Sequence, residues 1–110
     1  MHAITGNIQM KVFFLIMVDD PRYIAAKRMV EQGDINTFNQ LFSIIPKSIV
    51  AADLGTQNVR FTTLMNHIER FTLQELFMLS KLFSLDEKSI LELAYNQYME
   101  QRKSKSGKSQ

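Results

Sequence analysis

The chain has 110 residues, a length that predicts one domain with a modest hydrophobic core. Hydrophobic residues make up 45% of the sequence and charged residues 22%, values of a soluble globular protein that exclude disorder throughout. The absence of cysteine excludes disulfides and thiolate metal sites, so we expect a cytoplasmic protein.

Positive charge is concentrated at the C-terminal end. Of the 13 lysines and arginines, four lie in the last ten residues, "QRKSKSGKSQ", which contain no acid. The rest of the chain therefore holds nine basic side chains against 11 acidic ones and is slightly acidic. We interpret residues 101–110 as a disordered basic tail, which is either a solvated end or a nonspecific nucleic-acid contact.

Residues 1–19 fit a helical domain poorly. The apolar run "VFFLIMV", residues 12–18, is much shorter than the roughly 20 residues that a membrane-spanning helix needs, so we expect no membrane span. The wider segment "NIQMKVFFLIMV" has the composition of a strand, yet no later segment resembles a partner strand. We treat residues 1–19 as an N-terminal arm of uncertain structure, and the sequence leaves open whether residues 1–16 belong to the natural protein.

From residue 20 the start and stop signals are helical. A first helix is predicted over residues 21–32, because Pro21 suits the first helical position and Gly33 favours a helix end. A second helix carries Phe38 and Leu41 and is ended by Pro46, which disfavours helical geometry in the residue before it.

The second half of the chain continues in the same way. Two helices flank Gly55, and "FTLQELF" places Thr72 three residues before Glu75, the spacing of a capping box at a helix start. Asp86 begins the last helix, which carries Ile90 and Leu93. We therefore predict an all-α domain of five or six helices over residues 20–100.

The stretch "IVAADLGTQNVRFTTLMNHI", residues 49–68, holds a lone glycine between two helical segments. A glycine at a helix end supplies left-handed backbone and allows a sharp turn, and a small residue at the crossing lets the second helix approach closely. The apolar, small and glycine positions in this stretch are Val50 and Ala51, then Leu54 and Gly55, then Phe61 and Leu64.

This order resembles the helix-turn-helix of the Cro and phage-repressor (Xre-type) family. The later string "RFTLQELFMLSKLFSLDEKSILELA" is similar to the fourth and fifth helices of that family. The resemblance covers about residues 37–95 and implies a lambda-repressor-like domain. The chain has Thr56 where the family usually has an aliphatic residue, and Lys47 where it often has glutamine.

The resemblance implies double-stranded DNA as the partner and a role in transcriptional regulation, with the second motif helix in the major groove. Asparagine and glutamine amides match adenine, and Val59 or a threonine methyl matches the thymine methyl. The residues expected at bases are Gln57, Asn58, Val59, Thr62, Thr63 and Asn66. The residues expected at phosphates are Lys47, Arg60, Arg70, Arg102 and Lys103, and DNA binding would require Lys27 and Arg28 to converge on the same face.

One motif reads about half a turn of duplex, so the resemblance also implies a homodimer. Two segments are candidates for the interface. One is the final helix, where Leu91, Tyr95 and Tyr98 are left over from the core pattern, and the other is the apolar run at residues 12–18. We prefer the final helix.

The alternative function is a helical protein-interaction module without DNA binding. Seven methionines are consistent with an adaptable surface, but Met29, Met65 and Met78 lie at helical spacing and are interpreted as core residues. We expect no enzyme, cofactor or metal, because phosphate-loop, nucleophile and paired-carboxylate motifs are lacking and His67 reads as a partly exposed helix-terminal side chain.

Overall fold

The computed structural model describes residues 20–108, with side chains described as far as Lys103. The described residues form six α-helices and no strand, which confirms the all-α prediction. A short 3₁₀ helix, η1 (Ile68–Arg70), follows α5. The α-helices are α2 (Arg22–Glu31), α3 (Phe38–Ile44), α4 (Lys47–Leu54), α5 (Asn58–Asn66), α6 (Leu73–Phe83) and α7 (Glu87–Lys108). The predictions made for residues 1–19 lie outside the described residues.

The starts of α6 and α3 follow from side chains that satisfy free backbone donors. The hydroxyl of Thr72 accepts from the backbone N–H of Glu75 at 3.1 Å, and Oε1 of Glu75 accepts from the backbone N–H of Thr72 at 3.0 Å. This confirms the predicted capping box of α6. Thr37 caps α3 in the same manner, since its hydroxyl accepts from the N–H of Gln40 at 3.2 Å.

Aromatic side chains from different helices meet in the core. The ring of Phe42 lies edge-on to those of Phe61 and Phe83, with centroids 5.5 Å and 6.4 Å away. Phe61 also packs edge-on against Phe71 at 6.1 Å, and Tyr23 against Phe83 at 5.0 Å. These contacts join α2, α3, α5 and α6 around one centre, so the position of α5 is fixed by the core and not only by its connecting loops.

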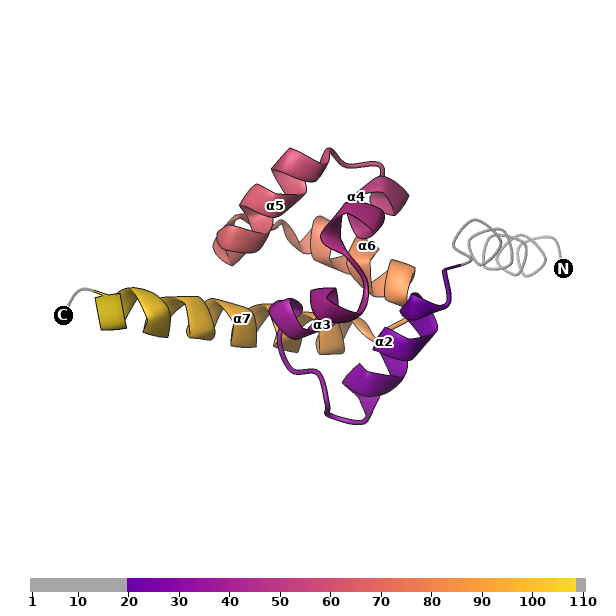
Figure 1. Cartoon of the computed structure of the whole chain (residues 1–110), viewed down its shortest axis with the longest axis horizontal. Helices are drawn as coiled ribbons and strands as arrows, with labels where there is room; N and C mark the ends of the chain where they lie inside the picture. Colours follow the sequence, from indigo (N-terminus) through magenta and orange to yellow (C-terminus); the bar gives the residue numbers. More distant parts are fainter. Residues whose placement is uncertain (1–19, 109–110) are drawn as a thin grey trace, which may run out of the picture.

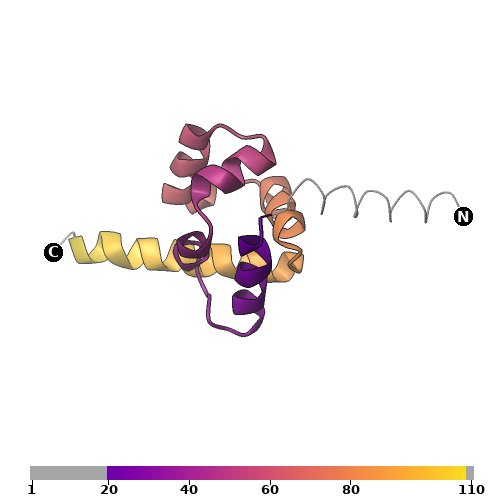
Figure 2. The same ribbon diagram turned by 45° about the vertical axis from the view of Figure 1, so that its right-hand side comes forward.

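Figures 1 and 2 show α4 and α5 together on one side of α7. The two helices predicted to meet DNA therefore form one end of the domain. None of the helices in the described part of the chain has the length and apolar composition needed to cross a bilayer.

The expectation of a disordered tail from residue 101 differs from the structure, in which α7 continues to Lys108. Two contacts hold the beginning of this segment. The side-chain amide of Gln101 donates to the carbonyl of Met65 at 2.8 Å, and the guanidinium of Arg102 lies 5.7 Å from the centroid of the Tyr98 ring. Glutamine, arginine and lysine are also good helix formers, so nothing in residues 101–105 stops the helix.

The methionines divide between the core and the surface. Met65 is buried and Met29 packs against the core, as predicted. Met78 is 43% exposed on α6, so its assignment as a core residue is wrong. The spacing of the α6 residues allowed two apolar faces, and the buried one is filled by Leu76, Leu79 and Phe83.

Candidate nucleic-acid interface

The turn between α4 and α5 has the geometry of a Schellman motif. Gly55 ends α4 in the left-handed conformation, with φ 75° and ψ 24°. Its N–H donates to the carbonyl of Ala52 at 3.0 Å, and the N–H of Thr56 donates to the carbonyl of Ala51 at 2.9 Å. The sequence prediction for this glycine is confirmed, and α5 begins three residues later at Asn58.

The inward side of the motif is buried as the spacing predicts. Val50 and Ala51 on α4 are almost fully covered, and so are Phe61 and Leu64 on α5. Ala51 has a methyl group only, which lets the two helices cross closely. Because Phe61 is also part of the aromatic core, the buried face of α5 is tied to α3 through Phe42 and to the start of α6 through Phe71.

The outward side of α5 carries most of the residues predicted to meet bases. Val59 is 78% exposed. Thr62 is half-buried, and the hydroxyl of Thr63 donates to the carbonyl of Val59 at 3.0 Å. The remaining predicted residues, Gln57, Asn58 and Asn66, are exposed.

The amides at the two ends of this surface are not engaged by other described side chains. Gln57 precedes α5 in an extended conformation and makes no capping hydrogen bond. Within residues 20–103, no hydrogen bond is formed by the side chains of Asn58 or Asn66. Their donors and acceptors are therefore available for the adenine edge or for water.

The predicted phosphate contacts do not form a single group. Lys47 starts α4 and is half-buried, whereas Arg70 is exposed on η1. Arg102 and Lys103 are exposed near the end of α7, and the contact between Gln101 and Met65 brings this part of α7 to the C-terminal end of α5. Basic side chains thus stand near both ends of the motif.

Arg60 has an acidic partner that the sequence analysis missed. Its Nη2 lies 2.6 Å from Oε2 of Glu75, the same residue that caps α6. Arg60 is the basic residue of α5, so this ion pair neutralises the helix that was predicted to enter the groove. The side chain stays 53% exposed, which makes it a surface pair with a small energy.

Two basic residues of α2, Lys27 and Arg28, were considered as additional phosphate contacts. Lys27 pairs with Glu31 along α2 at 3.0 Å. Helix α2 meets the first motif helix at Tyr23, whose hydroxyl donates to Asp53. That Lys27 and Arg28 share a face with the motif stays a prediction.

Acidic side chains near the motif are few and are mostly engaged. Asp53 on α4 accepts a 2.6 Å hydrogen bond from the hydroxyl of Tyr23. The pKa of Tyr23 is raised above its usual range, mainly by burial of the side chain and to a lesser extent by this bond. His67 ends α5 half-buried, with Nδ1 3.8 Å from Glu69 Oε2. Residues 20–103 contain no cluster of three or more histidine or acidic side chains able to hold a metal ion.

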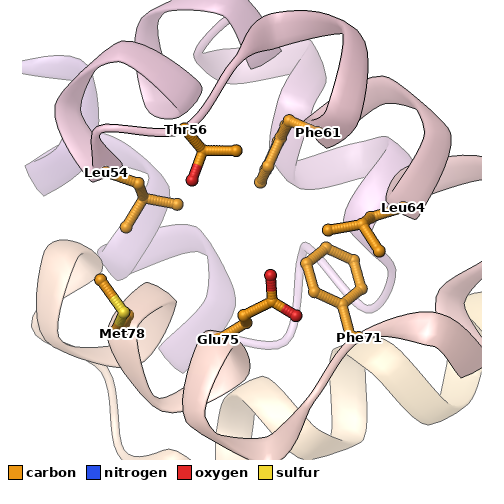
Figure 3. Close-up of a pocket in the computed structure, with 7 residues that line it drawn as sticks. All are labelled: Leu54, Thr56, Phe61, Leu64, Phe71, Glu75 and Met78. Carbon is orange, nitrogen blue, oxygen red and sulfur yellow. The ribbon is translucent and has the colours of Figure 1, made fainter.

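A small hollow separates the motif from α6. Leu54 and Thr56 line it from the end of α4 and the turn, Phe61 from α5, and Met78 from α6, while the Glu75 carboxylate points into it (Figure 3). Its free volume of about 20 Å³ suits a single water molecule, whereas small-molecule sites are usually at least about 300 Å³. In the observed conformation the hollow is smaller than such a ligand requires.

Comparison of the chain with protein-family models, with curated proteins and with solved structures found no match.

Proposed function

We propose that the protein binds double-stranded DNA through α4 and α5, arranged as a lambda-repressor-like helix-turn-helix, and regulates transcription by occupying its site. The observation that carries this proposal is the combination of the left-handed turn at Gly55 with an α5 whose buried side is fixed by Phe61 and whose outward side exposes Asn58 and Val59. A helix placed in this way can enter the major groove with its first residues.

The chemistry of the outward side supports base reading. The Asn58 amide can make a paired hydrogen bond to adenine, and the exposed Val59 methyls can contact a thymine methyl. Each well-formed paired contact discriminates between bases by about 1 to 3 kcal/mol. Since one motif reads about half a helical turn, two copies of the chain are proposed to bind a palindromic site.

The phosphate contacts are proposed to come from Lys47, Arg70, Arg102 and Lys103. Each neutralised phosphate lowers the slope of log K against log salt by about 0.9, so four contacts give a slope of about −3 to −4 per chain. The experiment is a salt titration of binding to duplex DNA. A slope near zero would contradict the proposed phosphate contacts.

Base reading is tested separately by substitution. Asn58→Ala is expected to weaken binding to a selected site by about tenfold to a hundredfold while leaving nonspecific binding unchanged. Gln32→Ala is the matched control, because Gln32 is an exposed amide at the end of α2, on the other side of the domain. Equal affinities of the two variants for the selected site would contradict a role of Asn58 in base reading.

A protein-interaction module is the second candidate function. It is favoured by two exposed apolar side chains on α6, Leu73 at 60% and Met78 at 43%, and by the ion pair that occupies Arg60. This function predicts that a Leu73→Ser, Met78→Ser variant loses its protein partner, whereas Asn58→Ala keeps it.

A further inference from the structure

Helix α7 carries an outward apolar stripe that lies mostly outside the domain core. Leu91 is 37% exposed and Tyr95 is 63% exposed, whereas Ile90 and Leu93 on the opposite side are buried in the core. The positions 91, 95, 98 and 102 follow spacings of four, three and four residues, which place them in one line along a helix. We call Leu91, Tyr95, Tyr98 and Arg102 the α7 stripe.

Tyr98 and Arg102 form the C-terminal half of the α7 stripe. Tyr98 is half-buried and packs against the edge of the core, and the guanidinium of Arg102 lies over its ring at 5.7 Å. The methylene stem of Arg102 therefore extends the apolar line while its charge remains in water. In Figure 1 this half of α7 projects beyond the other helices, so a second helix has room to approach it.

The charges beside the stripe are divided between its two ends. Glu87 and Glu92 lie on the N-terminal half of α7, and Arg102 and Lys103 lie on the C-terminal half. Lys88 and Glu100 are the exceptions. Two such helices attract each other when they run antiparallel, because the acidic half of each then lies beside the basic half of the other, whereas parallel pairing sets like charges side by side.

We propose that α7 is the interface with a second copy of this chain, and that the two α7 helices pair antiparallel about a two-fold axis. In this register Tyr95 packs against Tyr98 of the partner subunit, and Leu91 against the stem of Arg102 of the partner subunit. Glu92 then lies on the same flank as Lys103 of the partner subunit. The interface is self-complementary, as a two-fold dimer requires, and it does not depend on DNA binding.

The oligomeric state is measured by sedimentation equilibrium of the full chain. The wild-type protein is expected to dimerise, and Tyr95→Glu is expected to be monomeric at concentrations where the wild type is dimeric, because it places a charge in the middle of the stripe. Ile24→Glu is the matched control, since Ile24 is 60% exposed on α2 and outside the stripe. A monomeric wild-type chain, or a Tyr95→Glu chain that dimerises as well as Ile24→Glu, would overturn the proposal.

The direction of pairing is measured by cross-linking, and the absence of native cysteine makes the result unambiguous. A mixture of Leu91→Cys and Arg102→Cys chains of different tag length is expected to form the mixed disulfide under mild oxidation. Leu91→Cys alone is expected to cross-link poorly, because antiparallel helices separate the two copies of position 91 by about 16 Å along the axis. Efficient cross-linking of Leu91→Cys to itself would show parallel pairing and overturn the register.

Charge exchange tests the flank without changing the apolar stripe. Glu92→Lys and Lys103→Glu are each expected to raise the dissociation constant of the dimer by about tenfold, since each change creates two repulsive pairs. The variant with both changes is expected to return to within about threefold of the wild type. Additive weakening in the double variant would overturn the pairing of these two positions.

Discussion

Arg60 on α5 and Glu75 on α6 are joined by a 2.6 Å ion pair, and the same carboxylate closes the capping box of α6. Oε1 of Glu75 accepts from the backbone N–H and the hydroxyl of Thr72, while Oε2 accepts from Arg60. One acidic residue thus fixes the start of α6 and holds the positive charge of α5. While this ion pair is formed, part of the positive charge and of the N–H donors of Arg60 is engaged by Glu75 and is not available to a phosphate.

Replacing Glu75 by glutamine should release Arg60 while keeping the cap, because glutamine also serves at the third position of a capping box. We expect Glu75→Gln to bind duplex DNA more tightly and to steepen the salt slope by about 0.9, the value of one additional phosphate contact. Stability should change by less than about 1 kcal/mol, since the pair is exposed. The measurement is a salt titration of DNA binding, with urea unfolding alongside.

Glu69→Gln is the control for this change. It removes the same charge from an exposed position on η1, which has no arginine partner among residues 20–103. If both variants steepened the salt slope equally, the effect would come from net charge and not from the release of Arg60.

Replacing Gly55 by alanine should destabilise the fold through the backbone alone. Gly55 has φ 75°, and an added Cβ would meet no atom within 4 Å. The cost is therefore that of the left-handed conformation, about 1 kcal/mol, and Gly55→Asn should cost less because asparagine tolerates this conformation. Urea unfolding of the three proteins checks the order. Equal stability of the alanine and glycine proteins would contradict the left-handed turn.

Removing the hydroxyl of Tyr23 should loosen α2 from α4. Tyr23→Phe loses a 2.6 Å hydrogen bond to the Asp53 carboxylate in a side chain that is 5% exposed. We expect a loss of about 1 to 2 kcal/mol in the free energy of unfolding. Tyr95→Phe should be neutral and serves as the control, because it keeps the ring that the α7 stripe uses and removes a hydroxyl with no hydrogen bond within residues 20–103.

The raised pKa of Tyr23 predicts how the free energy of unfolding changes at alkaline pH. Burial and the bond to Asp53 raise the pKa of Tyr23 above its usual value of 10.0. The unfolded chain therefore loses this proton near pH 10 while the folded chain keeps it, so the contribution to stability is complete below pH 10 and is lost as the pH rises above it. Unfolding measured between pH 8 and pH 11 should show a steeper fall for the wild type than for Tyr23→Phe. Parallel curves would contradict this assignment.

Local signals in the sequence predicted the helix ends well. The capping box at Thr72 and the left-handed glycine at position 55 each depend on neighbours within a few residues, so their chemistry is readable without a fold. The burial of Val50 and Phe61 followed from the spacing of apolar residues on one helix face.

Contacts between distant parts of the chain were not predicted. Tyr23 and Asp53 are 30 residues apart, and Gln101 reaches the carbonyl of Met65 over 36 residues. Periodicity says which face of a helix is polar but does not say which polar side chain of another helix will meet it. The composition of residues 101–110 favoured disorder, and the contact of Gln101 with Met65 could not be read from the sequence. The continuation of α7 into this basic segment was therefore not predicted.

Base reading by the exposed side of α5 is measured by selecting bound sequences from a pool of random duplexes. The wild-type chain is expected to select a palindromic site, and Asn58→Ala is expected to select the same site with the preference for one base pair per half-site removed. Recovery of no preferred sequence by the wild type, or of an unchanged site by Asn58→Ala, would contradict it.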